Sequence, residues 1–229
     1  MRGSTGLNDM LESHQHPLPL PEEIFAKLID CSSFSHIDLS DAYFQVEMDE
    51  ESKKLLVINT HRGLFMFNRL SQGVKPATGI YQQLMDTMLS GIDGVSAFLD
   101  DIIIGGSTVE ICLERTRKVF QRLKDYGFTL KSEKCKFLMR SLKYLGIILD
   151  KDGQRPDPEK ITAILKMPQP SNLTEVRSFL GAINWYRKFV PEMSKLQVSL
   201  DKLLLNLNGR NHVRNHSINS RRFCLLRYH

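Results

Sequence analysis

The sequence predicts an α+β fold in which an antiparallel sheet packs on helices. Short apolar runs bounded by turn residues, such as 55–58 and 64–67, indicate strands joined as hairpins. Two longer segments, 76–89 and 108–126, carry apolar residues at helical spacing and indicate amphipathic helices. Hairpins form antiparallel pairs and each helix must cover its apolar stripe, so both kinds of element are expected to share a core.

Turn and cap signals predict the other elements. Pro21 suits the first turn of a helix, because its ring fixes φ near the helical value. Asn172 with Glu175 offers a capping box for a helix that continues to about residue 189. A short helix is expected at 159–166, and strands are expected at 34–38, 43–48, 128–130, 135–138 and 142–149.

The helical stripes predict which side chains are buried. The helix at 76–89 is expected to bury two stripes: Ile80, Leu84 and Met88, and beside them Tyr81, Met85 and Leu89. The helix at 108–126 is expected to end at Gly127 and to bury Cys112, Thr116, Val119 and Leu123. The helix after Asn172 is expected to bury Val176, Phe179, Leu180 and Ile183.

Two adjacent carboxylates, Asp100 and Asp101, lie between apolar runs in the segment SAFLDDIIIGG. These runs are too short for helices and indicate buried strands. Unit charges about 4 Å apart repel by roughly 4 kcal/mol at an effective dielectric constant of about 20, so the pair needs a cation or counter-ion to stay ionised. Taken alone, the pair is also compatible with a plain hairpin whose tip is Asp-Asp.

A second acidic site lies upstream, in the segment FSHIDLSDAYFQVEM at residues 34–48. Asp38 ends a strand-like stretch and is followed by a turn-prone segment. Asp38 and the Asp100–Asp101 pair are therefore expected to meet at the ends of neighbouring strands. Three carboxylates in that position suit two Mg²⁺ ions about 3.5 to 4 Å apart, an arrangement that serves phosphoryl transfer.

The composition is typical of a globular chain, with 41% hydrophobic and 25% charged residues among 229. No apolar run approaches the length of a membrane helix, about 18 residues, and the first residues lack the apolar segment of a signal peptide. The four cysteines, Cys31, Cys112, Cys135 and Cys224, show no metal-ligand spacing and are expected to be reduced. We therefore expect an intracellular protein with no membrane partner, in either the cytoplasm or the nucleus.

The net charge of +5 is less informative than its distribution. Residues 206–229 contain five arginines and no acidic residue, and without them basic and acidic residues balance at 26 each. Residues 1–114 carry 7 basic and 17 acidic side chains, whereas residues 115–205 carry 19 basic and 9 acidic ones. An acidic half followed by a basic half fits a metal site joined to a surface for nucleic-acid phosphates, although a solvated lysine-rich face would give the same counts.

Five ordered blocks resemble the motifs of a reverse transcriptase, and their amino-acid sequences are similar to those of Gypsy-type LTR retrotransposon polyproteins. The blocks are FxxIDLSDAYFQV, LSQGVKPATGIYQQLMD, FLDDIII, GFTLKSEKC and LKYLGIIL, and the resemblance covers residues 4 to about 204. It implies a right-hand polymerase palm with a partial helical thumb. The expected parts are a remnant leading into the palm at 1–33, the palm at 34–153, a partial thumb or connection at 154–205 and a disordered tail at 206–229.

The resemblance implies template-directed addition of deoxynucleotides to a primer on an RNA or DNA template. Asp38, Asp100 and Asp101 match the family's metal-binding carboxylates, and Leu39 matches the residue whose backbone carbonyl helps to hold a metal. The implied cofactors are two Mg²⁺ ions, or Mn²⁺ in their place. Phe98 stands where the family usually has Tyr, and LSQG replaces its common LPFG, but neither departure removes a metal ligand.

Other positions match the family's dNTP site. Tyr43 falls on the bulky residue that excludes a ribose 2′-hydroxyl, and Gln72 and Gly73 match the segment that lines the incoming nucleotide. Lys134 matches a lysine proposed to protonate the leaving pyrophosphate. Judged by the residues alone, Tyr43 is equally compatible with an aromatic in the core, and Lys134 with a solvated basic strand.

Two segments match the family's contacts with primer and template. Tyr144, Leu145 and Gly146 match the hairpin that grips the primer end, where a small residue lets backbone approach backbone. The segment FLGAINWYRKFV matches part of the thumb, and four of its residues are expected to contact the duplex backbone: Trp185, Tyr186, Arg187 and Lys188. Trp185 and Tyr186 are also compatible with packing of the helix against its neighbours.

Two functions remain open at this point. In the family, a pair of fingers strands precedes the segment that starts at Ser4, and the thumb continues beyond the matched part. The alternative to an active polymerase is therefore a catalytically inactive retroelement remnant that at most binds nucleic acid. An RNA-templated RNA polymerase is disfavoured by the bulky Tyr43.

Overall fold

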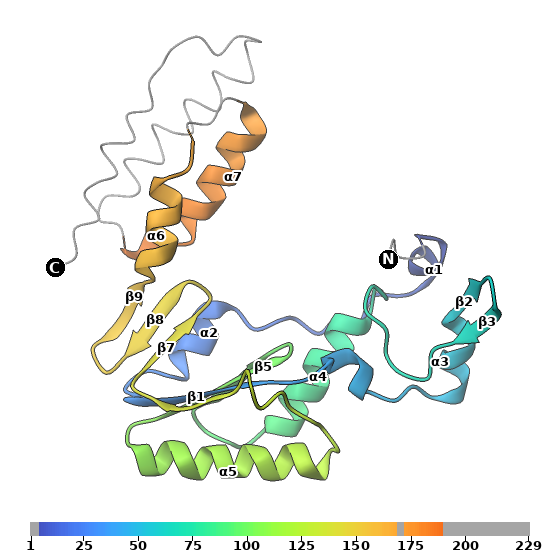
Figure 1. The fold of residues 1–229 in the computed structure, drawn as a ribbon, viewed down its shortest axis with the longest axis horizontal. Coiled ribbons are helices and arrows are strands. Elements are labelled where there is room, and N and C mark those ends of the chain that lie inside the picture. The colour runs from blue at the N-terminus through green and yellow to red at the C-terminus, as the bar shows by residue number, and fades with distance from the viewer. Residues whose placement is uncertain (1–4, 169–171, 190–229) are drawn as a thin grey trace. The chain divides into compact units, whose positions relative to one another are not determined.

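Four antiparallel strands form the sheet that carries the acidic motifs. A computed structural model describes residues 5–168 and 172–189 (Figure 1). The strands run in the order β4-β5-β1-β6 and span Val95–Phe98, Asp101–Gly106, Ser33–Asp38 and Lys136–Met139. β1 pairs with β5 without interruption from Ser33 opposite Gly106 to Asp38 opposite Asp101, whereas its pairing with β6 contains an irregularity. The predicted antiparallel sheet is confirmed.

Two helices cover one face of this sheet (Figure 1): α4, Ala77–Leu89, and α5, Val109–Asp125. Side chains alternate between the faces of a strand, so Ile37 of β1 and Ile102 of β5 point to the helices. Both isoleucines are completely buried in one core cluster with residues of α4 and α5. The neighbouring pair, Asp38 and Asp101, therefore points to the opposite face.

Helix α5 forms as the sequence predicts. The Thr108 hydroxyl caps its start by accepting a hydrogen bond from the backbone N–H of Ile111, and Gly127 follows its end with a φ of 72°. The predicted inward residues Cys112, Thr116, Val119 and Leu123 are all buried. The spacing of these four side chains was sufficient to predict both the helix and its orientation.

Helix α4 is also confirmed, but its buried face differs from the prediction. Tyr81, Met85 and Met88 are completely buried. Ile80, which was expected in the core, is 37% exposed, and the polar Gln82 is completely buried instead. The helix is therefore rotated toward the face that carries Tyr81 and Met85, and this rotation places the Gln82 amide beside strand β4.

Adjacent glycines at the end of β5 allow close packing on both faces of the sheet. A Cβ at Gly105 would lie 2.7 Å from Sγ of Cys31 and 2.8 Å from Cδ2 of Leu28, both of which follow α2 (Pro21–Ala26). A Cβ at Gly106 would overlap the backbone at Cys112 in α5. Larger residues at these two positions would push the covering elements away from the sheet.

The strand expected at 43–48 is wrong, because this segment forms a short 3₁₀ helix, η1, at Ala42–Gln45. Asp41 adopts the left-handed conformation with a φ of 46°, which turns the chain out of the extended path of β1. The Gln45 side chain then secures the turn: its Oε1 accepts a 2.6 Å hydrogen bond from the Thr129 N–H, and its Nε2 donates to the Ser40 carbonyl. These side-chain contacts replace the strand pairing that the apolar pattern predicted.

The segment after η1 also contains an unexpected helix. Helix α3, Glu50–Leu55, starts at Asp49, whose side chain accepts hydrogen bonds from the N–H groups of Glu51 and Ser52. The predicted hairpin is confirmed as β2, Val57–Thr60, and β3, Gly63–Met66, so the strand begins two residues later than expected.

The strand predictions after α5 are partly wrong. Residues 128–130 form only an isolated bridge between Leu130 and Leu39. The continuous strand expected at 142–149 is split into β7, Ser141–Tyr144, and β8, Ile147–Asp150, which form a three-stranded sheet with β9, Gly153–Pro156. The turn between β7 and β8 contains Leu145 and Gly146, both with positive φ, so an extended strand cannot continue through them.

The chain divides into two compact units, of which the second comprises Lys143–Ile148 and the residues from Gln154 onward. Its helices are α6, Pro158–Leu165, and α7, Leu173–Asn184, followed by a short 3₁₀ helix, η2, at Arg187–Phe189. Asn172 caps α7 as predicted by accepting a hydrogen bond from the Glu175 N–H, but the α-helix ends at Asn184, before the expected residue 189. Within α7, Val176 and Ile183 are buried, while Phe179 and Leu180 are partly buried.

The first unit also contains α1, Thr5–Met10. Across the described part of the chain, every helix is too short or too polar to span a lipid bilayer. Cys31, Cys112 and Cys135 are free thiols, whereas Cys224 and the predicted tail at 206–229 lie outside the described residues. The end of the predicted thumb segment, from residue 190, also lies outside them.

Met85 and Ile80 of α4 differ in burial, so replacing each by alanine should lower the free energy of unfolding by different amounts. We expect Met85→Ala to lower the free energy of unfolding by about 2–5 kcal/mol, because it leaves a cavity beneath the sheet. Ile80→Ala should cost less than about 1 kcal/mol, because that side chain is already partly in water. Urea unfolding followed by circular dichroism would measure both, and equal losses would contradict the assigned orientation of α4.

Candidate active site

The predicted carboxylates meet at one end of the main sheet. Asp38, the last residue of β1, lies directly opposite Asp101, the first residue of β5, and Asp100 lies in the two-residue turn before it. The backbone N–H of Leu39 donates a 2.9 Å hydrogen bond to the Asp100 carbonyl, which ties the turn to the end of β1. The Asp38 side chain is 14% exposed and that of Asp101 31%, so a ligand from solvent can reach Asp101 more easily.

Lys134 contacts Asp38 directly. Its Nζ lies 3.1 Å from Oδ2 of Asp38. The loop that carries the lysine is attached to the same strand end, because the Lys131 N–H donates a 3.1 Å hydrogen bond to the Asp38 carbonyl. The hydrogen bond to Asp38, together with the negative charge of Asp38, raises the pKa of Lys134. The ammonium therefore stays protonated beside the carboxylates.

Asp101 contacts a residue that the sequence did not identify. Nε2 of His36 lies 2.7 Å from Oδ1 of Asp101. His36 precedes Asp38 by two residues on β1, so both side chains point to the same face, and Asp101 is the diagonal neighbour of His36 across the strand pair. The two-residue periodicity of a strand is a signal that could have placed His36 in the site.

Tyrosines lie beside the carboxylates. The Tyr43 ring is partly buried, with its centroid 5.0 Å from that of Tyr81, and its hydroxyl donates a 3.4 Å hydrogen bond to Oγ1 of Thr78. Tyr81 is completely buried, and burial, with a smaller contribution from the charge of Asp100, raises its pKa. Tyr81 therefore lies within electrostatic range of Asp100, and Tyr43 packs beside Tyr81 at the edge of the core.

The segment at Gln72 and Gly73 is an exposed loop. Asn8 braces it from the N-terminal region: its Nδ2 donates a 2.8 Å hydrogen bond to the Gly73 carbonyl, and its Oδ1 accepts a 2.9 Å bond from the Lys75 N–H. Both residues remain accessible to a ligand, and the loop is held from behind by side-chain contacts.

The predicted primer-grip residues belong to the second unit, where they form the turn between β7 and β8. Tyr144 is buried. Nε1 of Trp185 donates a 3.0 Å hydrogen bond to the Leu145 carbonyl, and a Cβ at Gly146 would lie 2.5 Å from the Tyr186 hydroxyl. The end of α7 therefore supports this turn, and a side chain at position 146 would force the buried Tyr186 ring to shift.

The four residues predicted to contact the duplex differ in exposure. Tyr186 is 6% exposed, so it packs inside the second unit. Packing of the helix against its neighbours was the alternative to a duplex contact for this residue. Trp185 is 37% exposed even though its indole N–H is engaged, and Arg187 and Lys188 are exposed. Lys188 donates a 2.6 Å hydrogen bond to Oε1 of Gln154. Trp185, Arg187 and Lys188 are the members of this group that a partner could contact.

Comparison with known proteins identifies the family of this chain. A family model described as "Reverse transcriptase (RNA-dependent DNA polymerase)" matches residues 4–149. The chain belongs to the reverse transcriptase family. It is 45% identical over 188 residues to the uncharacterized protein K02A2.6 of Caenorhabditis elegans, and this match covers 82% of the chain but 15% of that relative. It is 34% identical over 192 residues to the retrovirus-related Pol polyprotein from transposon 297 of Drosophila melanogaster, covering 83% of the chain and 18% of the relative.

Solved structures show the same fold. The foamy viral protease-reverse transcriptase in complex with double-stranded DNA superimposes with a TM-score of 0.87 at 24% identity, covering 96% of this chain and 39% of that one. Its complex with an RNA/DNA hybrid gives a TM-score of 0.82 at 22% identity, and the match covers 98% of this chain and 30% of that one. The chain thus has a reverse transcriptase fold and spans less than a fifth of the length of the curated relatives described above.

Reverse transcriptases generally use divalent metal ions, and the donor atoms here fit such ions in kind. Carboxylate and carbonyl oxygens are the ligands that Mg²⁺ prefers, and the buried Oδ1 of Asp38 has no hydrogen-bond partner among the described residues. Within those residues, however, no three His, Cys, Asp or Glu side chains gather closely enough to hold an ion. Asp38 and Asp101 instead each contact a basic side chain, Lys134 and His36.

The contact between Lys134 and Asp38 predicts competition between the ammonium and a divalent cation. We expect Lys134→Met to tighten Mn²⁺ binding by about threefold to tenfold, because removing a positive charge near the carboxylates reduces repulsion of the ion. Isothermal titration calorimetry with MnCl₂ would measure the dissociation constant.

The matched control is Lys118→Met, which removes a lysine that pairs with Glu114 on α5 at 2.8 Å. It changes the net charge equally but lies on a helix away from the carboxylates. If both variants shifted the dissociation constant by the same factor, a direct effect of Lys134 at Asp38 would be ruled out.

Proposed function

We propose that the chain is the polymerase domain of a Gypsy-type retroelement reverse transcriptase, which adds deoxynucleotides to a primer on an RNA or DNA template. The observation that carries this proposal is the pairing of Asp38 with Asp101 at the end of two strands, with Asp100 in the adjoining turn. A plain hairpin with an Asp-Asp tip would need no third carboxylate opposite it. The presence of this third group favours a site that handles a cation and a phosphate.

The carboxylates of Asp38, Asp100 and Asp101, with the Leu39 carbonyl, would hold two Mg²⁺ ions, or Mn²⁺. When bound, such ions lower the pKa of the primer 3′-hydroxyl and neutralise the leaving pyrophosphate. Lys134 lies beside Asp38 with a raised pKa, so it reaches the reaction protonated. From that position its ammonium can contact the departing pyrophosphate and give it a proton.

The same geometry offers a basis for nucleotide selection. Tyr43 is held by Thr78 and by its contact with the buried Tyr81, so its ring cannot easily move aside. In the proposed site the ring would occupy the space that a ribose 2′-hydroxyl needs. Gln72 and Gly73 would line the incoming dNTP from the exposed loop that Asn8 braces.

Nucleic acid is the proposed partner. Residues 115–205 carry 19 basic and 9 acidic side chains, which favours contact with phosphates. The foamy viral neighbours were solved with double-stranded DNA and with an RNA/DNA hybrid. We assign residues 34–153 to a palm, with 1–33 leading into it, and 154–205 to a partial thumb whose exposed Trp185, Arg187 and Lys188 would touch the duplex. Template, primer and dNTP are all found within cells, so the proposed setting is intracellular.

Primer extension tests the proposed reaction. With Mg²⁺, dNTPs and a primed RNA template, we expect the chain to extend the primer and Asp100→Asn to lower the rate about 100-fold or more, because an amide holds a divalent cation far less well. Asp152→Asn, which alters an exposed carboxylate in the turn before β9, serves as the matched control and should retain full activity. Equal signals from the unaltered chain and Asp100→Asn would support the inactive remnant and refute the polymerase.

Ribonucleotide incorporation tests the role of Tyr43. We expect Tyr43→Ala to raise the use of ribonucleotides relative to deoxynucleotides by about 10- to 100-fold, because the space beside the sugar opens. Tyr43→Phe keeps the ring and loses only the hydroxyl, so it should discriminate as the unaltered chain does. The measurement is the ratio of kcat/KM for a matched rNTP and dNTP, and an unchanged ratio in Tyr43→Ala would rule out this role.

A further inference from the structure

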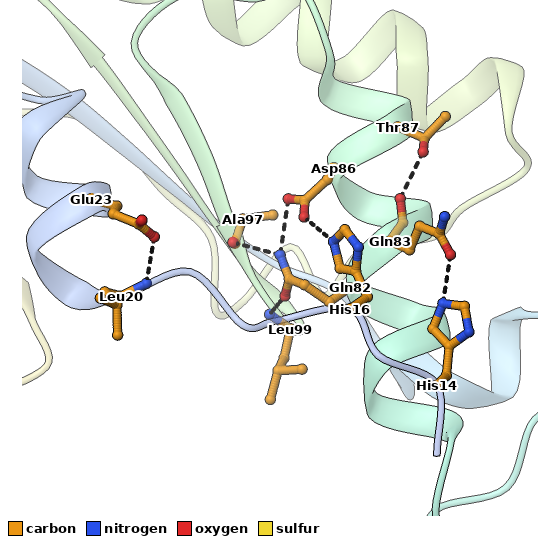
Figure 2. Close-up of polar contacts among 10 residues, drawn as sticks. All are labelled: His14, His16, Leu20, Glu23, Gln82, Gln83, Asp86, Thr87, Ala97 and Leu99. Carbon is orange, nitrogen blue, oxygen red and sulfur yellow. Dashed lines mark hydrogen bonds and ion pairs between the residues drawn. The ribbon is translucent and has the colours of Figure 1, made fainter. Parts of the chain in front are cut away.

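A buried glutamine side chain contacts the backbone of the turn that carries Asp100. Figure 2 shows Gln82 of α4 beside the outer edge of β4, between Ala97 and Leu99. Its Nε2 donates a 3.0 Å hydrogen bond to the Ala97 carbonyl, and its Oε1 accepts a 2.9 Å bond from the Leu99 N–H. Among the described residues β4 is the edge strand of the sheet, so these backbone groups have no further strand there to pair with on that side. The glutamine amide takes the place of that strand.

The contact matters because the turn is held in an unfavourable conformation. Leu99 has a φ of 54°, a region that residues with a side chain rarely adopt. Such a conformation persists only where the surrounding structure holds it. Leu99 directly precedes Asp100, so the hydrogen bond to its N–H helps to fix where the adjacent carboxylate points.

The orientation of the Gln82 amide is set in turn by a carboxylate. Nε2 of Gln82 also donates a 3.0 Å hydrogen bond to Oδ1 of Asp86, one turn further along α4 (Figure 2). An ionised carboxylate only accepts hydrogen bonds, so it requires the NH₂ end of the amide to face it. Both hydrogens of the amide are then used, and its oxygen is left facing Leu99.

The second oxygen of Asp86 connects this arrangement to the N-terminal part of the chain. Nε2 of His16 lies 2.7 Å from Oδ2 of Asp86, and the two side chains are 27% and 44% exposed. His16 belongs to the proline-containing segment at 14–20, called the strap here, which passes α4 (Figure 2). A continuous chain of contacts therefore runs from the strap through Asp86 and Gln82 to the turn that carries Asp100.

We propose that His16 and Asp86 are positioning residues for the Leu99–Asp100 turn, and that they act by fixing the amide of Gln82. The catalytic consequence rests on the polymerase function proposed above, whereas the effect on the turn does not. None of the three residues is expected to touch substrate. Their role is to keep the Asp100 carboxylate in one place as charge develops in the reaction.

The structure supplies a matched control for this proposal. A second contact joins the strap to α4, in which Nε2 of His14 lies 2.6 Å from Oε1 of Gln83 (Figure 2). Gln83 follows Gln82 in the sequence but faces away from β4. Breaking this contact also releases a link between the strap and α4, but it does not disturb the amide that holds the turn.

The first readout is hydrogen exchange at the Leu99 amide, measured by NMR on the full chain without nucleic acid. We expect Asp86→Leu and His16→Leu to speed this exchange by about tenfold, with Gln83→Leu changing it less than about twofold. Asp86→Asn keeps an oxygen for the Gln82 amide and should behave as the unaltered chain. If Leu99 exchanged equally in Asp86→Leu and Gln83→Leu, the proposal would be overturned.

The second readout is single-nucleotide primer extension, which separates positioning from a purely structural role. We expect Asp86→Leu to lower kcat by about 10- to 100-fold and to change the KM for dNTP less than about twofold. Unchanged kcat with faster Leu99 exchange would overturn the positioning role. If the unaltered chain does not extend primers, the polymerase proposal fails. The effect of His16 and Asp86 on the turn is then decided by hydrogen exchange at Leu99 alone. If Asp86→Leu fails to fold, His16→Leu decides the question, because His16 lies outside α4 and its side chain is partly exposed.

Discussion

The pairing register of β1 and β5 determines where every acidic group of the site lies. Ile37 faces Ile102 beneath the sheet, and both are completely buried against α4 and α5. Because faces alternate along a strand, this apolar pair forces the next pair, Asp38 and Asp101, to the face opposite α4 and α5. A slip of one residue would bring an isoleucine into solvent and an aspartate into the core, so the hydrophobic core enforces the alignment of the carboxylates.

Bringing these carboxylates together creates a repulsion that the chain itself partly offsets. Lys134 reaches Asp38 from the loop before β6, and His36 reaches Asp101 from β1. The Lys134 ammonium is a counter-ion of the kind that adjacent carboxylates require, and the His36 imidazole adds a hydrogen-bonding contact to Asp101. The loop with Lys134 is attached to the Asp38 carbonyl, so the lysine and the strand end form one local structure. A metal ion entering the site would therefore compete with contacts that already exist.

Sequence patterns predicted elements whose burial follows a regular period, and they failed where single side chains redirect the backbone. Helix α5 followed from four residues at helical spacing, and the meeting of Asp38 with the Asp100–Asp101 pair followed from their places at strand ends. The segment after Asp38 was mistaken for a strand because Gln45 bonds to the distant Thr129, a contact with no local signal. Gln82 was missed for a similar reason, since its burial depends on the edge of β4 and not on helical period.

The edge position of β4 explains why a side chain, and not another strand, completes its hydrogen bonds. An additional strand beside β4 would satisfy the backbone at Ala97 and Leu99, but it would also extend along the turn and cover the carboxylates. An unprotected edge would invite pairing with another chain. The Gln82 amide bonds the Ala97 carbonyl and the Leu99 N–H, so it protects the end of this edge next to the turn while leaving Asp100 exposed. The hydrogen bonds of Gln82 thus hold the turn in place and also leave the Asp100 side chain accessible to a ligand.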